Sequence, residues 1–292
     1  MSTRPKSSAD GAQHSFGSSG FVSLEGGRRL HYMERGEGDV TVVFESGMGF
    51  SRSTWGLVAP VIGDCTRAVV YDRAGLGRSD DDDEGRTLER IADDLGALLD
   101  ALGAERYLLV GHSWGGPIVR RAAAEHPERI AGIVLVDQTD ENCALYFAAS
   151  TAKRFAASGP MVRTLARLKL YRAIGGNAGK QQPADVAADH LAEDFTLRAA
   201  TTSGAEIENL LVDLADLRDH PLHLDGIPVT VISGTKPARG DGGLRESLVA
   251  AHRATAQKLD GRLVEATGSG HLVMFSEPGL VVDEIVRLLD RD

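Results

Sequence analysis

The sequence has little cysteine, no long apolar run and no cluster of basic residues. Its 292 residues include two cysteines, Cys65 and Cys143, too few for a disulfide framework. No apolar run approaches the ~18 residues that a membrane-spanning helix needs. The formal net charge of −10, from 32 basic and 42 acidic residues, disfavours binding to nucleic acid or to an anionic membrane. We therefore expect a cytoplasmic protein, a monomer or homodimer, with no nucleic-acid or membrane partner.

The N-terminal residues 1–20 lack the apolar centre of a signal peptide. They are rich in serine, glycine and alanine, a composition that predicts a disordered tail. Hydrophobic residues make up 42% of the chain and charged residues 25%, which is ordinary for a globular protein and sufficient for a full core.

Strand patterns alternate with helix patterns over most of the chain. Apolar and β-branched runs, typical of strands buried on both faces, occupy residues 40–45, 66–71, 107–110 and 130–136. Residues 21–33 predict an antiparallel hairpin, and residues 87–102 carry apolar side chains at helical spacing. The alternation predicts an α/β fold with a mostly parallel central sheet and helices on both faces.

The alternation breaks at residues 138–226, which predict helices only. Four helices are expected around residues 143–157, 161–174, 183–202 and 205–218. The strand pattern returns at residues 228–233. We therefore expect a core made of residues 21–137 and 227–292, with residues 138–226 inserted as an α-helical cap.

The most informative stretch is Gly-His-Ser-Trp-Gly at residues 111–115, between the apolar run 107–110 and a helix pattern. Gly-x-Ser-x-Gly in this context is typical of a nucleophile elbow, a tight turn that lifts one serine above the edge of a sheet. Ser113 would stand at a helix N-terminus, where free N–H groups favour a developing negative charge. Ser113 is therefore the predicted nucleophile.

A serine hydroxyl is a weak nucleophile and needs a base. Of the nine histidines, His271 is the best candidate because it follows the last predicted strand in a loop of small residues, Gly268-Ser269-Gly270. This loop leaves the imidazole room to reach Ser113.

These motifs resemble the α/β-hydrolase family in type and order. The resemblance is carried by Gly-His-Ser-Trp-Gly-Gly at residues 111–116, by Asp-Arg-Ala-Gly-Leu-Gly-Arg-Ser at residues 72–79 and by Gly270-His271. It implies the α/β-hydrolase fold and a serine hydrolase of the esterase or lactonase type. Epoxide hydrolases and haloalkane dehalogenases of this fold use an aspartate nucleophile, so Ser113 argues against both.

The resemblance also implies a carboxylate that orients the imidazole and stabilises its charged form. Most relatives carry it in a Gly-x-x-Asp turn after the strand that follows the cap, but here that turn ends in Pro237. Asp241 lies four residues later, and Asp137 occupies the other position that relatives use, directly after the strand 130–136. We favour Asp137, with Asp241 as the alternative acid and Asp140 as a third choice.

An oxyanion hole is implied in the same way. Its donors would be the backbone N–H groups of Trp114, which follows the nucleophile, and of Met48, in the loop after the strand 40–45. Such donors are worth about 3 kcal/mol each in the transition state. Gly47, Met48 and Trp114 are also expected to contact the substrate.

The sequence therefore predicts a serine hydrolase for a small, fairly apolar carboxylic ester or lactone, acting through an acyl-enzyme without a metal or an organic cofactor. The same triad would serve an amidase, an aminopeptidase, a thioesterase or a carbon–carbon bond hydrolase. A lyase of the hydroxynitrile lyase type and a non-catalytic ligand-binding homologue are further alternatives. An intact elbow serine argues against the non-catalytic one.

Overall fold

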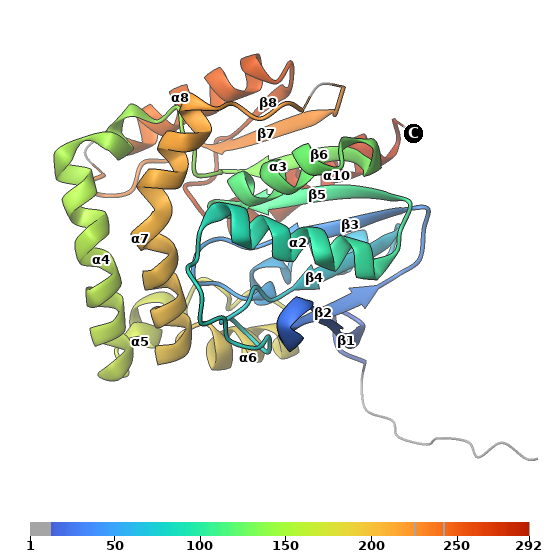
Figure 1. Cartoon of the computed structure of the whole chain (residues 1–292), viewed down its shortest axis with the longest axis horizontal. Helices are drawn as coiled ribbons and strands as arrows, with labels where there is room; N and C mark the ends of the chain where they lie inside the picture. Colours follow the sequence, from blue (N-terminus) through green and yellow to red (C-terminus); the bar gives the residue numbers. More distant parts are fainter. Residues whose placement is uncertain (1–12, 225, 242, 292) are drawn as a thin grey trace, which may run out of the picture.

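The computed structural model describes residues 13–224, 226–241 and 243–291 (Figure 1). Its centre is an eight-stranded sheet with the strand order β1-β2-β4-β3-β5-β6-β7-β8. Six strands are parallel to one another: β3 (Val40–Glu45), β4 (Arg67–Tyr71), β5 (Arg106–His112), β6 (Ile130–Val136), β7 (Val229–Gly234) and β8 (Arg262–Ala266). This is the mostly parallel central sheet that the alternating patterns predict, and it agrees with the α/β-hydrolase fold that the resemblance implies.

The remaining two strands, β1 (Ser18–Ser23) and β2 (Arg29–Arg35), form the expected antiparallel hairpin at one edge. Part of the predicted disordered tail, residues 1–12, lies outside the described residues. For residues 18–20 the prediction is wrong, because they belong to β1 and Ser18 pairs with Glu34. Backbone hydrogen bonds along an edge strand do not require apolar side chains, so composition could not reveal this strand.

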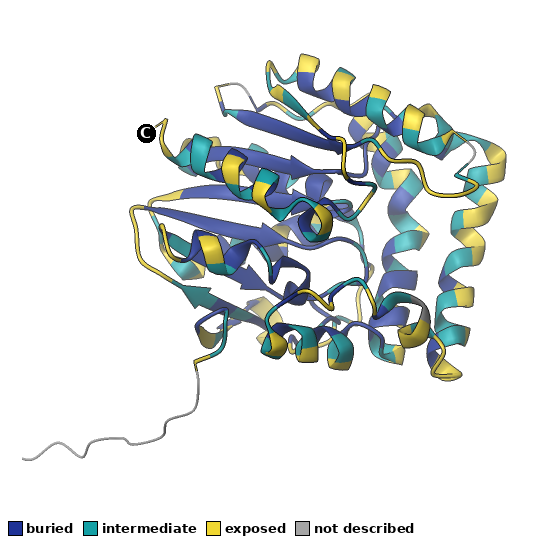
Figure 2. Ribbon diagram, turned by 180° about the vertical axis from the view of Figure 1, so that it is seen from behind, coloured by how far each residue is buried: buried dark blue, intermediate teal, exposed yellow. Residues whose placement is uncertain are grey.

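The sheet separates two hydrophobic cores. Within β6, Ile133 and Leu135 face one core while Val134 and Val136 face the other, as strand alternation requires. The first core is closed by α2 (Leu88–Leu102), α3 (Gly115–Glu125) and α8 (Leu244–Lys258). The second is closed by α1 (Ala59–Ile62), α9 (Val273–Ser276) and α10 (Pro278–Leu289). The central strands are consequently buried along their whole length (dark blue in Figure 2).

A helical insertion separates β6 from β7. It contains α4 (Ala149–Arg167), α5 (Tyr171–Gly175), α6 (Ala184–Glu193) and α7 (Leu197–Asp219), and α4 and α7 stand side by side at one end of the sheet (Figure 1). The breaks predicted near residues 157–161 and 202–205 are wrong, because α4 and α7 run through them. A Cβ added to Gly159 would lie 3.3 Å from the Cα of Gly204, so these glycines bring the two helices close together.

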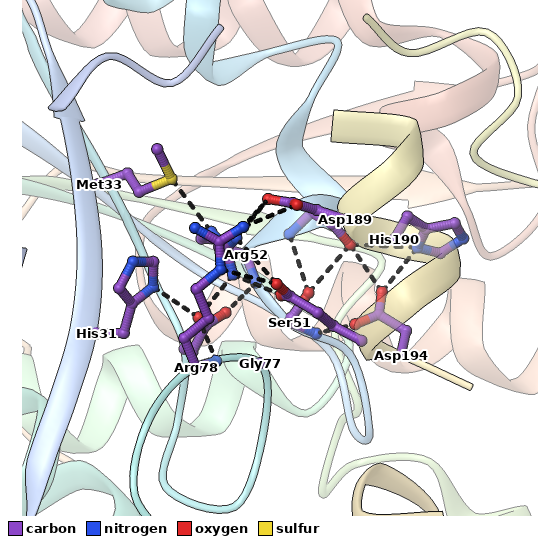
Figure 3. Close-up of polar contacts among 12 residues, drawn as sticks. His31, Met33, Ser51, Arg52, Gly77, Arg78, Asp189, His190 and Asp194 are labelled. Carbon is purple, nitrogen blue, oxygen red and sulfur yellow. Dashed lines mark hydrogen bonds and ion pairs between the residues drawn. The ribbon is translucent and has the colours of Figure 1, made fainter. Parts of the chain in front are cut away.

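Buried arginines attach the insertion to the sheet. The side chain of Arg52, in the short helix η2 (Arg52–Trp55), is fully buried and forms ion pairs with Asp72, which follows β4, and with Asp189 and Glu193 of α6 (Figure 3). Removing one partner from a buried ion pair leaves an uncompensated charge, so such clusters bind two segments firmly in one arrangement. No helix in the described part of the chain is long and apolar enough to cross a membrane.

Candidate active site

Ser113 occupies a sharp turn between β5 and α3. Its φ is +52°, in the left-handed region that residues with a side chain seldom adopt. The Ser113 N–H donates to the carbonyl of Val136, and the Ser113 carbonyl accepts the N–H of Thr139. A Cβ on Gly111 would lie 2.4 Å from the carbonyl oxygen of Gly115, so the turn closes only with glycine there. The local geometry is that of a nucleophile elbow.

The ends of three strands bring Ser113, His271 and Asp137 together. His271, in the loop between β8 and α9, has its Nε2 3.1 Å from the Oγ of Ser113. Its Nδ1 lies 2.7 Å from the Oδ2 of Asp137, which directly follows β6. Asp137 is fully buried, whereas 47% of the His271 side chain is exposed. The result is a continuous hydrogen-bonded chain from a buried carboxylate to an accessible serine.

The second oxygen of Asp137 is also occupied. Its Oδ1 accepts the N–H of Gly234 at 2.9 Å and the Nη1 of Arg245 at 2.6 Å. Burial opposes the ionisation of Asp137, but the hydrogen bond from His271 and the nearby His252 and Arg245 outweigh it and hold the pKa well below its usual range. Asp137 is therefore a carboxylate at neutral pH, and the Nδ1 of His271 donates to it.

The other two candidate acids are engaged elsewhere. Asp241 precedes α8, and its carboxylate accepts the backbone N–H groups of Gly243 at 3.1 Å and Arg245 at 3.3 Å. Asp140 accepts a hydrogen bond from the hydroxyl of Thr255 at 2.7 Å. Within the described residues, neither carboxylate is hydrogen-bonded to His271. The geometry therefore favours Asp137 as the partner of the histidine.

His112, inside the elbow, also contacts His271. Its ring is buried, its centroid lies 4.7 Å from that of His271, and its Nε2 lies 3.1 Å from the His271 carbonyl oxygen. Burial, together with the neighbouring His271, lowers the pKa of His112 to about 3. The ring is therefore neutral near pH 7, and its Nε2–H donates to the backbone of the loop that carries His271.

The two backbone donors expected for an oxyanion hole flank the elbow. Across the described residues, the structure gives neither the Met48 N–H nor the Trp114 N–H a hydrogen-bond partner. Arg73 donates to the carbonyl of Gly47 at 2.9 Å and so fixes the loop that presents Met48. A Cβ on Gly47 would lie 3.2 Å from the Cβ of Ser113, so this loop lies directly against the elbow.

A cavity of about 340 Å³ opens beside Ser113. Most of its lining is apolar or aromatic: Met48, Trp114, Tyr146, Phe155, Leu210, Leu244 and Leu248. Phe155 comes from α4 and Leu210 from α7, so the helical insertion forms one wall. Gly47 is not among the lining residues, and its expected contact with substrate stays a prediction.

Sequence reasoning missed three polar residues of this cavity: Thr139, Tyr146 and Arg245. The Thr139 hydroxyl lies 3.4 Å from the Oγ of Ser113. One feature of the sequence could have identified Arg245. It lies in the first turn of a helix, where the positive end of the helix dipole disfavours a cation, so its presence there requires a compensating partner. As to metals, no three His, Cys, Asp or Glu side chains of the described residues are grouped to hold an ion.

Comparison with known proteins gives a family match over most of the chain. The model described as "Alpha/beta hydrolase family" matches residues 42–284. An uncharacterized protein of Bacillus subtilis, YqjL, is 36% identical over 113 residues, which cover 38% of this chain and 45% of the relative. The cis-3-alkyl-4-alkyloxetan-2-one decarboxylase of Shewanella oneidensis is 39% identical over 115 residues, which cover 38% of this chain and 36% of the relative. The chain thus spans less than half the length of these relatives.

A solved structure also resembles the whole fold. The epoxide hydrolase CorEH superposes with a TM-score of 0.71 at 18% identity, covering 94% of this chain and 99% of its own. Identity this low shows a shared fold alone.

Proposed function

The chain belongs to the alpha/beta hydrolase family, and on this premise we propose that it is a serine hydrolase that cleaves a carboxylic ester or lactone. The observation that carries the proposal is the hydrogen-bonded chain from Asp137 through His271 to Ser113, which ends at the wall of an apolar cavity. Nucleophile, base and orienting acid are the three groups that acyl transfer by a serine requires.

In the proposed reaction, Ser113 Oγ attacks the carbonyl carbon while His271 Nε2 takes the hydroxyl proton. Asp137 keeps the proton of His271 on Nδ1, so that Nε2 is free to accept. The imidazolium then protonates the leaving oxygen, and the acyl group stays on Ser113. A water molecule that gives a proton to His271 next attacks this acyl-enzyme and releases the acid.

The negative charge of each tetrahedral intermediate would be held by the Met48 and Trp114 N–H groups. Their lack of another partner in the described structure supports this role, because a donor already in use would have to break a bond first. Trp114 precedes α3 directly, so the helix dipole adds to the stabilisation.

The cavity supports a small, fairly apolar substrate. Its volume of about 340 Å³ lies at the low end for ligand pockets. The Shewanella oneidensis relative is named as a decarboxylase of an oxetan-2-one. An oxetan-2-one is a cyclic ester, so the compound in that name, though not the reaction, agrees with a lactone substrate. The amidase, thioesterase and carbon–carbon hydrolase alternatives share the same triad and differ in the leaving group.

Residues 138–226 would act as the cap that selects this substrate, placed over a core of residues 21–137 and 227–292. Phe155 and Leu210, both in the cavity wall, support that role for the helical insertion. The cytoplasmic location and the monomeric or homodimeric state stay predictions.

The test is intact-mass analysis after incubation with a fluorophosphonate, on the wild type and on Ser113→Ala, alongside turnover of a simple activated ester. We expect one stoichiometric adduct and ester turnover in the wild type, and neither in the variant. A folded wild type that gives no adduct and no turnover would refute the proposal and favour a ligand-binding role.

A further inference from the structure

Arg245 links the ends of two strands at the base of the candidate triad. Its Nη1 donates to the Oδ1 of Asp137 at 2.6 Å and to the carbonyl of Gly234 at 3.0 Å. Asp137 follows β6 and Gly234 ends β7, whereas Arg245 lies in the first turn of α8. Only 11% of the Arg245 side chain is exposed, and Arg245 is one of the residues that line the cavity beside Ser113.

This placement is costly and is compensated locally. A helix N-terminus repels a cation, and burying a guanidinium is unfavourable without a partner. Asp137 supplies the partner charge. Asp241 places a second negative charge at the same helix end, where it accepts the N–H of Arg245 itself. The guanidinium thus has one carboxylate as its ion-pair partner, and a second carboxylate caps the helix that carries it.

We propose that Arg245 is a positioning residue of the triad, which fixes the Asp137 carboxylate toward His271 and tempers how strongly that carboxylate stabilises the protonated imidazole. The proposal rests on the hydrolase function proposed above. Two donors, the Gly234 N–H and the Arg245 guanidinium, hold Oδ1. The carboxylate plane therefore cannot rotate freely, and Oδ2 is presented to the Nδ1 of His271.

The charge effect follows from the groups around Asp137 and His271. The titratable and charged groups that interact with them are His112 from β5, Tyr146 from η4 (Ala144–Phe147), and His252 and Arg245 from α8. Asp241, in the loop before α8, lines the same cavity. Arg245 shares the carboxylate of Asp137 with His271 and is a permanent cation. Removing its charge leaves the imidazolium facing a less neutralised carboxylate, so His271 should hold its proton to higher pH.

The experiment compares Arg245→Gln with Arg245→Lys in ester turnover as a function of pH. Arg245→Gln should raise the midpoint of the acid limb of kcat/KM by about one pH unit. It should lower the plateau kcat by about tenfold with little change in KM. Arg245→Lys keeps the charge, so its midpoint should stay near that of the wild type. Its kcat should still fall, because an ammonium lacks the planar fork of a guanidinium.

Arg253→Gln is the matched control on the same helix. Arg253 is 54% exposed in its side chain and pairs with Glu265, outside the cavity lining. This variant should keep both the pH profile and kcat. In an Asp137→Asn background, Arg245→Gln should shift the midpoint less, because most of the proposed effect acts through the Asp137 carboxylate.

An NMR titration of the His271 ring in the same variants tests the proposal independently of activity, because it measures the midpoint of the His271 titration directly. An unmoved His271 midpoint in folded Arg245→Gln would overturn it, as would an equal shift in the Asp137→Asn background. If Arg245→Gln does not fold, wild-type kcat in Arg245→Lys would overturn it. Loss of wild-type labelling and turnover, with the His271 shift intact, would instead refute the hydrolase function alone.

Discussion

Replacing Asp137 by asparagine tests the proposed triad directly, because the structure dictates how the new amide must lie. The Oδ1 position is surrounded by two donors, the Gly234 N–H and the Arg245 guanidinium, so the amide oxygen must occupy it. The amide nitrogen then points at the Nδ1 of His271. Since the amide donates there, His271 must carry its proton on Nε2, where it can no longer accept the proton of Ser113.

The size of the loss follows from this wrong tautomer. The same replacement in a chymotrypsin-type protease lowers kcat by about 10⁴-fold, and we expect a similar loss here. That factor corresponds to about 5.4 kcal/mol of transition-state stabilisation. The folded state should persist, because asparagine has nearly the same shape as aspartate.

Asp241→Asn is the matched control, since Asp241 is the alternative acid and asparagine also caps helix N-termini. It should keep kcat within about twofold of the wild type. The assay is kcat and kcat/KM on an activated ester, with thermal unfolding followed by circular dichroism. The reasoning fails if folded Asp137→Asn retains more than about a tenth of wild-type activity. It fails equally if Asp241→Asn is the more damaged variant.

Three further predictions concern the attachment of the helical insertion to the sheet and its pH dependence. Glu206→Gln removes a buried carboxylate that pairs with Arg73 and Arg86. Urea titration should therefore show a loss of about 3 kcal/mol in the free energy of unfolding, and an unchanged free energy would contradict a stabilising role of these ion pairs. Burial opposes the ionisation of Asp72, but its hydrogen bonds and nearby cations outweigh it and lower its pKa. The stabilisation that ionised Asp72 contributes is therefore complete above the ordinary aspartate pKa near ~4 and is lost as the pH falls below it. The Tm should drop between about pH 4 and pH 2, and a Tm that stays constant over this range would contradict the role of Asp72. Gly159→Val forces α4 away from α7 and should cost about 1–3 kcal/mol in thermal unfolding, whereas wild-type stability would show that the helices do not pack so closely.

Local patterns in the sequence were enough to predict most of the core. The run Ile130–Val136 is apolar throughout, and it forms a strand buried on both faces. The elbow could be predicted for the same reason, because a strand, a glycine-flanked serine and a helix are consecutive in the chain. Such features depend on neighbouring residues, whose spacing fixes the backbone conformation and the face that is buried.

The helix boundaries predicted within the helical insertion were less accurate. The sequence predicts separate helices around residues 143–157 and 161–174, yet α4 continues through Gly159 and Pro160 between them. Glycine in a helix interior is less favourable than alanine by about 1 kcal/mol. The close packing of α4 against α7 at this glycine outweighs that cost. Ser18 was predicted to lie in a disordered tail but belongs to β1. Its strand conformation depends on pairing with Glu34 in another strand, which its neighbours in the sequence do not indicate.

Local sequence was sufficient to identify the family motifs, the candidate nucleophile and the order of the strands along the chain. The carboxylate that contacts His271 became evident from the packed fold alone, because Asp137 lies 134 residues away in the chain and the sequence left Asp241 open as an alternative. The contacts of Arg245 could not be predicted from the sequence for the same reason, because its partners, Asp137 and Gly234, lie at the ends of two other strands. Contacts of this kind follow from how the elements pack together, which no short stretch of sequence specifies.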